Sequence, residues 1–578
     1  MKVDKLWKVK DVDEKIIEQL KDQIKLKGGD DVIYQLLMLR GVTNFDSGAQ
    51  YCNPQKGPFH HPYLMKDMDK AVERIQQAAN NQEGIMIYGD YDVDGTTAVA
   101  TVYDFLRKNL PNYDPAHIHY YIPNRSSEGY GLTQQGIQTC VDLNIKLVIT
   151  LDCGIKSVEE VEQLQKFGID TIICDHHLLG ATVPKAIAIL NPKQPDCEYP
   201  FKELSGCGIG YKLIEALSNK WQLPEESYKQ YLDLVVISIA ADIVPMLDEN
   251  RALAYLGLKK INTNPSPAVD SLKRLSKLHQ RVKIENLIFG LAPFINAVGR
   301  MDDAKKVISF FIESNNNKST EIAHKIKELN DDRRVINESI NKLAHKQVSL
   351  NENKDEAATV VYHEDWHKGV LGIVASKLVD EYYKPTIVLT KSNGLITGSA
   401  RSIEGFNMHE AFKQCDDLLE NYGGHYFAAG LTMKPEYYET FVSRFQEIAS
   451  KALKGKIPQP TLAIDAVLRL NQVTDSLYNT ICRFEPFGPD NLKPIFISKN
   501  VMNAGSNLIK DKHIRFKVKQ QDSKILDGIA FNLADKFNII KDCREFDIVY
   551  TIERNIWKNQ QHLQLFIIDI RPANHYSS

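Results

Sequence analysis

Three aspartates at every second position follow the first strand-like run of the sequence. They are Asp90, Asp92 and Asp94, which come directly after the apolar run Gly84 to Tyr88 and before a helix expected to start near Thr96. Carboxylates this close repel one another, so the arrangement is costly unless a cation lies among them. Taken alone, the segment could also be a calcium-like loop or a solvated turn.

Further candidate ligands follow the next apolar runs of the chain. They are Asp152 after the second run, Asp175, His176 and His177 after the third, and Asp242 at the end of an apolar segment whose periodicity fits helix and strand equally well. A lone histidine is more often a packed residue than a ligand, but this pair adjoins an aspartate at the end of a predicted strand. A buried aspartate with no Lys or Arg nearby in sequence needs a metal or a hydrogen-bond donor.

The charges of these groups fit two divalent ions. Two such ions carry roughly four positive charges. With His176 as a neutral nitrogen ligand, four aspartates would neutralise them: Asp92, Asp94, Asp152 and Asp242. Two ions ~3.5–4 Å apart can hold the attacking water and the phosphoryl oxygens of an in-line displacement. Oxygen ligands with one imidazole suit Mn²⁺ or Mg²⁺ better than zinc. The sequence therefore predicts hydrolysis of a phosphoester or phosphoanhydride.

A parallel sheet would bring these residues together. From about Lys66 to Asp242, amphipathic helical patterns alternate with short β-branched runs, at Gly84 to Tyr88, Lys146 to Leu151 and Asp170 to Cys174. Continuous apolar strands separated by helices are typical of a parallel sheet covered on both faces. Ligands of such sheets gather at the carboxyl ends of the strands, where these acids lie.

The rest of the chain predicts two more bodies. Arg300 to Lys368 contains no Gly or Pro and is dense in charge, which indicates one or two long connecting helices. A second α/β pattern begins at Thr359, and short alternating runs from about Gln459 to Ala573 indicate an all-β barrel. The predicted α/β architecture has five parts: an N-terminal segment (1–65), a parallel-sheet domain (66–300), a helical connector (301–355), a smaller α/β domain (356–455) and a barrel (456–578).

Composition narrows the class of protein. The 578 residues suggest roughly four domains. The 71 Lys and Arg against 74 Asp and Glu give a net charge of −3, so any basic surface that binds nucleic acid must be local. The nine cysteines include no C-x-x-C pair, and no apolar stretch approaches the ~20 residues of a membrane span. We expect a cytoplasmic protein without a membrane partner.

The order of these motifs resembles the DHH phosphoesterase superfamily. Within it, the flanking segments resemble the RecJ family of single-strand-specific DNA exonucleases, over almost the whole chain from Lys66. The segments are Pro123 to Arg125, Glu128 to Leu132, Asn296 to Met301, Gly398 to Ser402 and Gly423 to Gly430. The resemblance implies DHH and DHHA1 domains followed by an oligonucleotide-binding (OB) fold. One departure is Phe294, where the family often has Arg, so a phosphate contact there would be lost or moved.

The resemblance also implies roles for the candidate ligands. It assigns two Mn²⁺ or Mg²⁺ ions to Asp92, Asp94, Asp152, His176 and Asp242, with Asp90, Asp175 and His177 as close catalytic support. Spacing does not say which acid bridges the ions. His177 is the best candidate to donate a proton or to orient a phosphate, because a second imidazole beside a ligand imidazole can reach the substrate. Alternatively, His177 only fixes His176.

Residues that could hold a phosphate backbone occur in both α/β domains. Arg125 is flanked by Tyr120, Tyr121 and Tyr130, whose rings could stack on bases. Other candidates are Arg300, Ser399, Arg401, Gly423, Gly424 and His425. Glycines let main-chain N–H groups approach a phosphate closely, so the second domain is expected to clamp the strand.

A local basic surface is predicted in the barrel. His513 to Lys519 alternates strictly, so a strand there would place Arg515, Lys517 and Lys519 on one face and apolar residues on the other. From Lys510 to Lys524, six basic residues less two aspartates give a local net charge of +4. The alternative is an ordinary half-buried strand with a solvated face. The RecJ resemblance likewise implies an OB barrel at this position.

The function that follows is a metal-dependent exonuclease that degrades single-stranded DNA in recombination and repair. Digestion from the 5′ end to 5′-mononucleotides is implied by the resemblance alone, and a repair helicase and a single-strand-binding protein are expected partners by analogy. One alternative is a phosphoesterase for cyclic dinucleotides or short oligonucleotides, which would need neither barrel nor connector. The other is an inactive single-strand-binding scaffold, which would have lost some of the metal ligands that this chain keeps.

Overall fold

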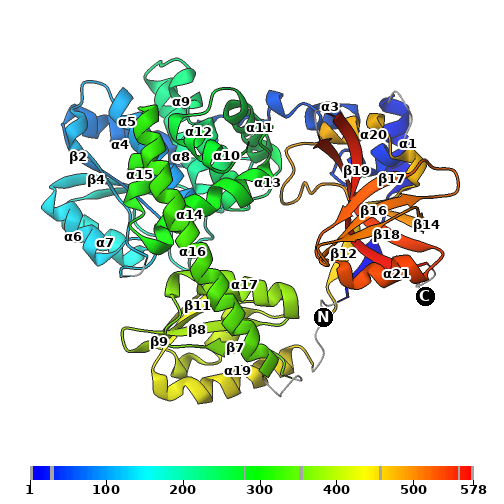
Figure 1. Cartoon of the computed structure of the whole chain (residues 1–578). Helices are drawn as coiled ribbons and strands as arrows, with labels where there is room; N and C mark the ends of the chain where they lie inside the picture. The colour runs from blue at the N-terminus through cyan, green and yellow to red at the C-terminus, as the bar shows by residue number, and fades with distance from the viewer. Residues whose placement is uncertain are drawn as a thin grey trace. The chain divides into compact units, whose positions relative to one another are not determined.

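The computed structural model describes nearly all of the chain and divides it into two compact units (Figure 1). One unit consists mainly of 60–242 and 257–460, and the other of 6–59, 243–256 and the chain from Thr461 onward. The described residues are 4–25, 31–125, 127–278, 280–350, 356–454, 458–557 and 560–573. Each unit is considered by itself.

A five-stranded parallel sheet forms the centre of the first unit, as predicted. Its strand order is β3-β2-β4-β5-β6. The strands are β2 (Gly84–Gly89), β3 (Ile118–Tyr121), β4 (Ile145–Leu151), β5 (Asp170–Cys174) and β6 (Ala188–Leu190). Its helices include α4 (Met68–Asn80), α5 (Val93–Asn109), α6 (Gln134–Asp142), α7 (Val158–Lys166), α8 (Gly206–Lys220) and α10 (Leu232–Ala241). The β-branched runs are buried because the sheet is covered on both faces.

Two local expectations are refined. Helix α5 begins at Val93, three residues before the predicted start, because the Asp92 side chain caps it by accepting a hydrogen bond from the Gly95 N–H at 3.0 Å. Asp94 therefore lies in the first helical turn rather than in the preceding loop. The apolar segment before Asp242, left open between helix and strand, is helix α10.

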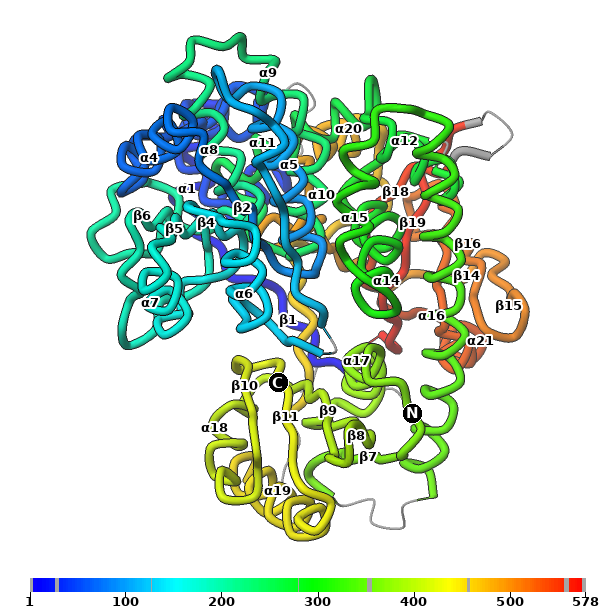
Figure 2. Tube along the Cα trace, turned by 90° about the vertical axis from the view of Figure 1, so that its left-hand side faces the viewer, coloured from blue at the N-terminus to red at the C-terminus, as the bar shows by residue number. Residues whose placement is uncertain are grey.

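The connector is a single long helix, α16 (Asn316–Leu350), shown in Figure 2 between the two α/β bodies of this unit. It follows α14 (Ala292–Met301) and α15 (Lys305–Phe311) and packs against α14 at one end and α17 (Leu371–Tyr382) at the other. The Gly- and Pro-free stretch of the sequence thus contains the predicted long helix. The connector fixes the second body to the first by continuous packing.

The second body of this unit is the smaller α/β domain. Its sheet has the order β10-β11-β9-β8-β7, in which only β7 and β8 are parallel. The strands are β7 (Thr359–Tyr362), β8 (Thr386–Ser392), β9 (Leu395–Arg401), β10 (Asn421–Gly424) and β11 (Ala428–Met433). Its other elements include η5 (Lys368–Val370), α18 (Met408–Lys413) and α19 (Tyr438–Ala452).

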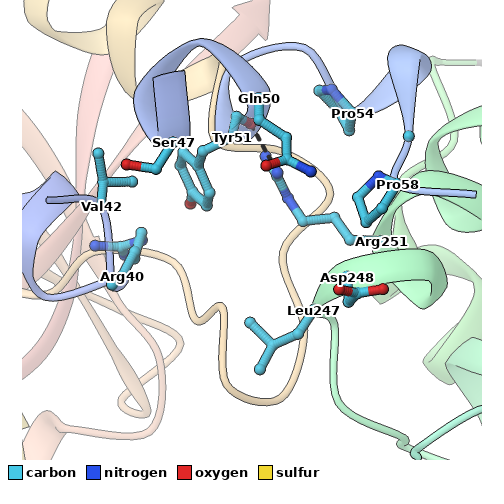
Figure 3. A pocket seen from close by; sticks show the side chains of 12 residues that line it. Arg40, Val42, Ser47, Gln50, Tyr51, Pro54, Pro58, Leu247, Asp248 and Arg251 are labelled. Atoms are coloured by element: carbon cyan, nitrogen blue, oxygen red, sulfur yellow. Dashed lines mark hydrogen bonds between the residues drawn. The ribbon is translucent and has the colours of Figure 1, made fainter. Parts of the chain in front are cut away.

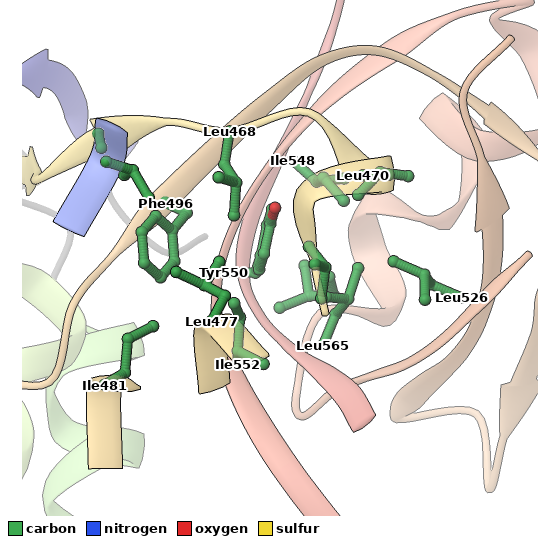
Figure 4. Packing of buried hydrophobic residues seen from close by; sticks show 14 of the residues in the cluster. Leu468, Leu470, Leu477, Ile481, Phe496, Leu526, Ile548, Tyr550, Ile552 and Leu565 are labelled. Atoms are coloured by element: carbon green, nitrogen blue, oxygen red, sulfur yellow. The ribbon is translucent and has the colours of Figure 1, made fainter. Parts of the chain in front are cut away.

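The second unit is a β-barrel with the N-terminal helices packed into its core. Strand β14 pairs with both β18 and β16, which closes the sheet β13-β14-β18-β19-β17-β16-β15. The strands are β13 (Ala466–Val467), β14 (Phe496–Asn503), β15 (Asn507–Ile509), β16 (His513–Lys519), β17 (Leu526–Ala530), β18 (Phe546–Trp557) and β19 (Gln560–Pro572). Figure 4 shows the core around Tyr550, Phe496 and Leu565. The barrel predicted from alternating runs is confirmed.

The N-terminal segment shares this core. Leu20 and Leu36, from α1 (Glu14–Gln23) and α2 (Asp31–Met38), are fully buried in the same apolar cluster as the barrel strands. Parallel pairing of β1 (Leu6–Val9) with β12 (Thr461–Ile464) joins the N-terminal segment to the chain that leads into the barrel. No described helix combines the length and the apolar composition needed to cross a membrane.

A small pocket lies in the second unit (Figure 3). Its volume is about 200 Å³, and Arg40, Tyr51 and Arg251 are among its lining residues. The Arg251 guanidinium donates hydrogen bonds to the Tyr51 and Phe484 carbonyls, at 2.7 and 3.0 Å, so it ties three segments together. None of the residues predicted to bind metal or substrate lines this pocket.

Candidate active site

The predicted ligands meet at the carboxyl end of the parallel sheet. Asp90 follows β2, Asp152 follows β4, and Asp175, His176 and His177 follow β5, while Asp242 ends α10. Ligand atoms lie within 4.8 Å of one another in three overlapping groups: Asp152, His176 and His177; Asp94, His176 and Asp242; Asp90, Asp92 and Asp152. Seven of the eight residues predicted to hold or support the metals therefore form one cluster, and the eighth, Asp175, contacts His177.

The cluster contains buried polar atoms without hydrogen-bond partners. They are Asp90 Oδ1, Asp152 Oδ1 and His176 Nε2. His176 Nε2 lies 3.1 Å from Asp152 Oδ1, 3.6 Å from Asp242 Oδ2 and 3.8 Å from Asp94 Oδ2. A buried polar atom without a partner is costly, and several of them aimed at one point fit a divalent cation. Oxygen donors with one imidazole nitrogen are the donor set that suits Mn²⁺ or Mg²⁺.

Burial and mutual repulsion perturb the acids of this cluster. Burial, followed by the charge of Asp92, raises the pKa of Asp90 well above its ordinary value. Burial, followed by the charge of Asp94, raises the pKa of Asp152 in the same way and that of Asp242 to about 9. Burial lowers the pKa of His176, which favours the neutral imidazole that a metal requires. Protein groups alone therefore do not stabilise the ionised cluster.

Asp94 is held by a helix that sequence reasoning did not connect with the site. The Gly206 and Cys207 N–H groups, at the start of α8, donate to its two carboxylate oxygens at 2.7 and 2.8 Å, and the Ser238 hydroxyl donates at 2.7 Å. A helix N-terminus stabilises a carboxylate in this way. A Cβ on Gly206 would lie 2.6 Å from the Asp152 Cβ, so the missing side chain lets α8 approach. The Gly-rich sequence of this segment was the available signal.

Asp175 orients His177. One Asp175 oxygen lies 2.7 Å from His177 Nδ1 and accepts from the His177 N–H, and the other accepts from the Ile155 N–H at 2.9 Å. Burial alone would lower the pKa of His177, but Asp175 raises it, and His177 in turn holds the pKa of Asp175 down. Tyr130 is exposed, and its hydroxyl donates to the Asp152 carbonyl at 3.0 Å and lies 3.3 Å from His177 Nδ1.

We expect divalent ions to stabilise the folded chain. The folded-state pKa of Asp242, about 9, exceeds its unfolded value near 3.8, so without metal its contribution is most favourable at low pH and is lost as the pH rises between these values. An ion at a hundred times its Kd adds about 2.7 kcal/mol, or roughly 5–10 °C in Tm. Thermal unfolding with EDTA and with MnCl₂ at pH 6 and 8.5 measures both effects.

The matched variant Asp242→Asn isolates the cluster from other titrating groups. Without metal, its Tm should fall less than that of the wild type between pH 6 and 8.5, and Mn²⁺ should shift its Tm less. Equal Tm values for the wild-type chain in EDTA and in MnCl₂ at pH 8.5 would contradict a metal site.

Three of the predicted phosphate-binding residues are arginines that form no ion pair with a described acidic residue. Of the charged groups that the structure describes, no carboxylate forms an ion pair with Arg125, Arg300 or Arg401. Arg125 lies over the Tyr91 ring, 4.9 Å from its centroid, and Arg300 donates to the Gly369 carbonyl at 2.7 Å. Burial, followed by the charge of Arg125, lowers the pKa of both Arg300 and Arg401. Neighbouring guanidinium groups without acidic partners fit an anion such as a phosphate.

Arg333 of α16, which sequence reasoning missed, belongs to the same group of arginines. It adds to the positive potential at Arg300, and its buried Nε has no hydrogen-bond partner in the described part of the chain.

The stacking surface predicted around Arg125 is corrected in part, because Tyr121 is 3% exposed and stacked on Tyr88. Tyr120 packs edge-on against Tyr103.

The second α/β domain places its predicted residues on β9 and on the β10–β11 hairpin. Arg401 donates to the Ser399 hydroxyl at 3.1 Å and to the Ala400 carbonyl at 2.8 Å. Gly423 and Gly424 end the edge strand β10, and His425 follows in the turn, exposed. Burial, then the charges of Lys156 and His177, lower the pKa of His425. The hairpin turn therefore lies near the carboxyl end of the parallel sheet.

The basic residues predicted for the barrel lie on one face of β16. Arg515, Lys517 and Lys519 are exposed, whereas Ile514, Phe516 and Val518 are fully buried. The predicted alternation is confirmed. A role in binding nucleic acid stays a prediction.

Comparisons with known proteins match this arrangement. The DHH family N-terminal domain model matches residues 84–239, the DHHA1 domain model 355–451, and the RecJ OB domain model 464–569. The single-stranded-DNA-specific exonuclease RecJ of Bacillus subtilis is 35% identical over 97% of this chain and 70% of that protein. The chain belongs to the RecJ family. The RecJ exonuclease of Escherichia coli is 29% identical over 88% of this chain and 91% of that protein.

Solved RecJ structures share the fold. RecJ of Thermus thermophilus in complex with Mn²⁺ matches 98% of this chain and 80% of that chain, with a TM-score of 0.84 and 22% identity. An exonuclease RecJ bound to manganese matches 68% of this chain and 96% of that chain, with a TM-score of 0.59 and 28% identity. The predicted architecture, a parallel-sheet domain, a connector helix, a smaller α/β domain and an OB barrel, is that of the RecJ family.

Proposed function

We propose that this chain is a metal-dependent exonuclease that degrades single-stranded DNA, as its RecJ relatives are named. The observation that carries the proposal is the carboxylate and imidazole cluster, with three buried ligand atoms that lack partners, in a chain 35% identical to a RecJ exonuclease. An inactive scaffold would not need to keep such a costly cluster of like charges. Work in recombination and DNA repair, which the family resemblance implies, is part of the same proposal.

The proposed ligands are Asp90, Asp92, Asp94, Asp152, His176 and Asp242. Two Mn²⁺ or Mg²⁺ ions held there supply activation of water and neutralisation of charge on the scissile phosphate when bound. Asp90, assigned above to catalytic support, joins this set because its oxygen lies with those of Asp92 and Asp152. The N–H groups at the start of α8 hold the Asp94 carboxylate in place.

The other residues bind and orient the substrate. His177, held at Nδ1 by Asp175, would present Nε2 to the phosphate or the leaving oxygen. Arg125, Arg300 and Arg401 would hold neighbouring phosphates, with Ser399 fixing the Arg401 guanidinium. The exposed Arg515, Lys517 and Lys519 would bind the strand farther along. Gly423, Gly424, His425 and Tyr130 complete the proposed substrate contacts.

DNA labelled at either end tests the proposal. We expect rapid loss of a single strand with MnCl₂, none with EDTA, and a rate at least about 100-fold lower on blunt duplex, because the bases of a duplex are paired and stacked and are not available to a site that binds an unpaired strand. A 5′ label should appear at once in mononucleotides, as polarity from the 5′ end requires. Faster turnover of a dinucleotide than of a long strand would instead favour the small-substrate phosphoesterase.

A cytoplasmic location, a helicase partner and a single-strand-binding partner belong to the same proposal. All nine cysteines are free, which agrees with a reducing compartment. The partners rest on analogy, since an enzyme restricted to single strands depends on a source of unwound DNA.

A further inference from the structure

Two neighbouring aromatic residues are exposed at the turn of the β10–β11 hairpin. Phe427 is 56% exposed and Tyr426 is 38% exposed, and their ring centroids lie 4.6 Å apart at an interplanar angle of 62°. The edge of one ring therefore supports the other. Neither residue belongs to an apolar core cluster among the residues that the structure describes. Contiguous exposed apolar side chains are typical of binding sites.

Main-chain hydrogen bonds hold this turn against the end of β9, the strand that carries Arg401. The Ser402 N–H donates to the Phe427 carbonyl at 2.9 Å, one residue after Arg401, and Ala428 pairs with Arg401 in the sheet register. The Met408 N–H donates to the Tyr426 carbonyl at 3.0 Å, and the Gly405 N–H donates to the Tyr426 hydroxyl at 3.0 Å. The main chain of both aromatic residues and the Tyr426 hydroxyl are thus fixed in position close to Arg401 in the chain and in the sheet.

The same turn lies near the catalytic cluster. His425 precedes the pair, and burial followed by the charges of Lys156 and His177 lowers its pKa. Lys156 follows the end of β4, and His177 follows β5, so both mark the carboxyl end of the parallel sheet. In Figure 2 the β10–β11 hairpin extends from the smaller domain toward the catalytic body of the same unit. The turn that carries the aromatic pair therefore lies near this end of the sheet.

We propose that Phe427, supported by Tyr426, is a stacking platform for one nucleobase of the strand whose phosphates the arginines hold. The inference rests on the proposed function and adds a base-binding subsite to it. A ring beside a phosphate site meets a base only if the base is unpaired, because a paired base presents its faces to its stacked neighbours. Stacking is tolerant of sequence, since every base has a π-face. The subsite would therefore select single strands without selecting a sequence.

Variants at Phe427 combined with abasic substrates test the subsite. The substrates are an oligo-dT strand and the same strand with abasic nucleotides at its first three positions. Phe427→Ala should lower kcat/KM on oligo-dT by roughly 5- to 150-fold, the range expected for one stacked base. The abasic substitution should lower the wild-type value by a similar factor, and Phe427→Trp should retain activity on oligo-dT. The abasic strand should not be cleaved more slowly by Phe427→Ala than by the wild type.

The matched control is Phe167→Ala. Phe167 is 53% exposed at the end of α7, at the amino end of the sheet and opposite the ligands, so its removal should change neither substrate. An equal loss on both strands in Phe427→Ala would mean that the residue only supports the fold, and would overturn the subsite. Binding of both strands in EDTA, followed by fluorescence anisotropy, gives the same comparison without hydrolysis. These measurements therefore distinguish the absence of a base-stacking subsite from an error in the proposed nuclease function.

Discussion

Asp152→Asn should abolish hydrolysis of single-stranded DNA while leaving the fold intact. Asp152 belongs to two of the three ligand groups, and its buried Oδ1 has no protein partner. Replacing the carboxylate removes one negative charge from the centre of the cluster, so kcat should fall by at least about 10³-fold, equivalent to roughly 4 kcal/mol. Initial rates with MnCl₂ on a labelled single strand measure this effect.

The same substitution should not destabilise the protein. Asp152 has a φ of 60°, a left-handed conformation that asparagine also tolerates. The pKa of Asp152 is raised by burial and by neighbouring acids, so a neutral side chain relieves repulsion, and the metal-free variant should unfold at or above the wild-type Tm. Activity above a tenth of the wild-type value would refute the assignment of Asp152 as a ligand.

Asp233→Asn is the matched control. Asp233 is also a buried aspartate with a raised pKa, but its carboxylate accepts hydrogen bonds from the Leu234 and Ser266 N–H groups. We expect this variant to lose some stability and to keep its rate of hydrolysis. The pair of variants separates loss of a ligand from loss of a buried charge.

Arg401→Gln should weaken the hold on the strand. The Arg401 guanidinium is fixed by Ser399 and the Ala400 carbonyl and has no acidic partner among the described residues, so its charge is available to a phosphate. Loss of one charged hydrogen-bonding group costs about 1.5–3 kcal/mol, so kcat/KM should fall roughly 10- to 150-fold. Binding in EDTA should show a salt dependence, log Kd against log salt, that is shallower by about 0.7.

Arg444→Gln provides the comparison within the same domain. Arg444 already forms an ion pair with Asp417 on the surface, so its replacement should leave affinity and salt dependence unchanged. An unchanged salt dependence in Arg401→Gln would mean that Arg401 serves the fold and not the phosphate.

The sequence alone determined which candidate metal ligands meet in the structure. Asp90, Asp152 and His176 each follow a strand of one parallel sheet, and covalent order with parallel pairing must bring those strand ends to one edge. Alternation at Ile514 to Lys519 likewise fixed which residues of β16 face solvent, because side chains alternate along a strand. Both inferences depend on local periodicity and chain direction, which the sequence states directly.

Only the tertiary structure decided the contacts between distant segments. The Gly206 N–H reaches Asp94 across 112 residues, and Gln35 donates to the Asp465 carbonyl across 430, so the N-terminal helices enter the barrel core. No periodic pattern in the sequence indicates that these distant residues are in contact. The position of the Phe427 turn beside Arg401 is of the same kind, since strand register and packing set it. Spacing in the sequence indicated the candidate ligands and most of the arginines, and packing added the α8 N-terminus, Arg333 and the Tyr426–Phe427 pair.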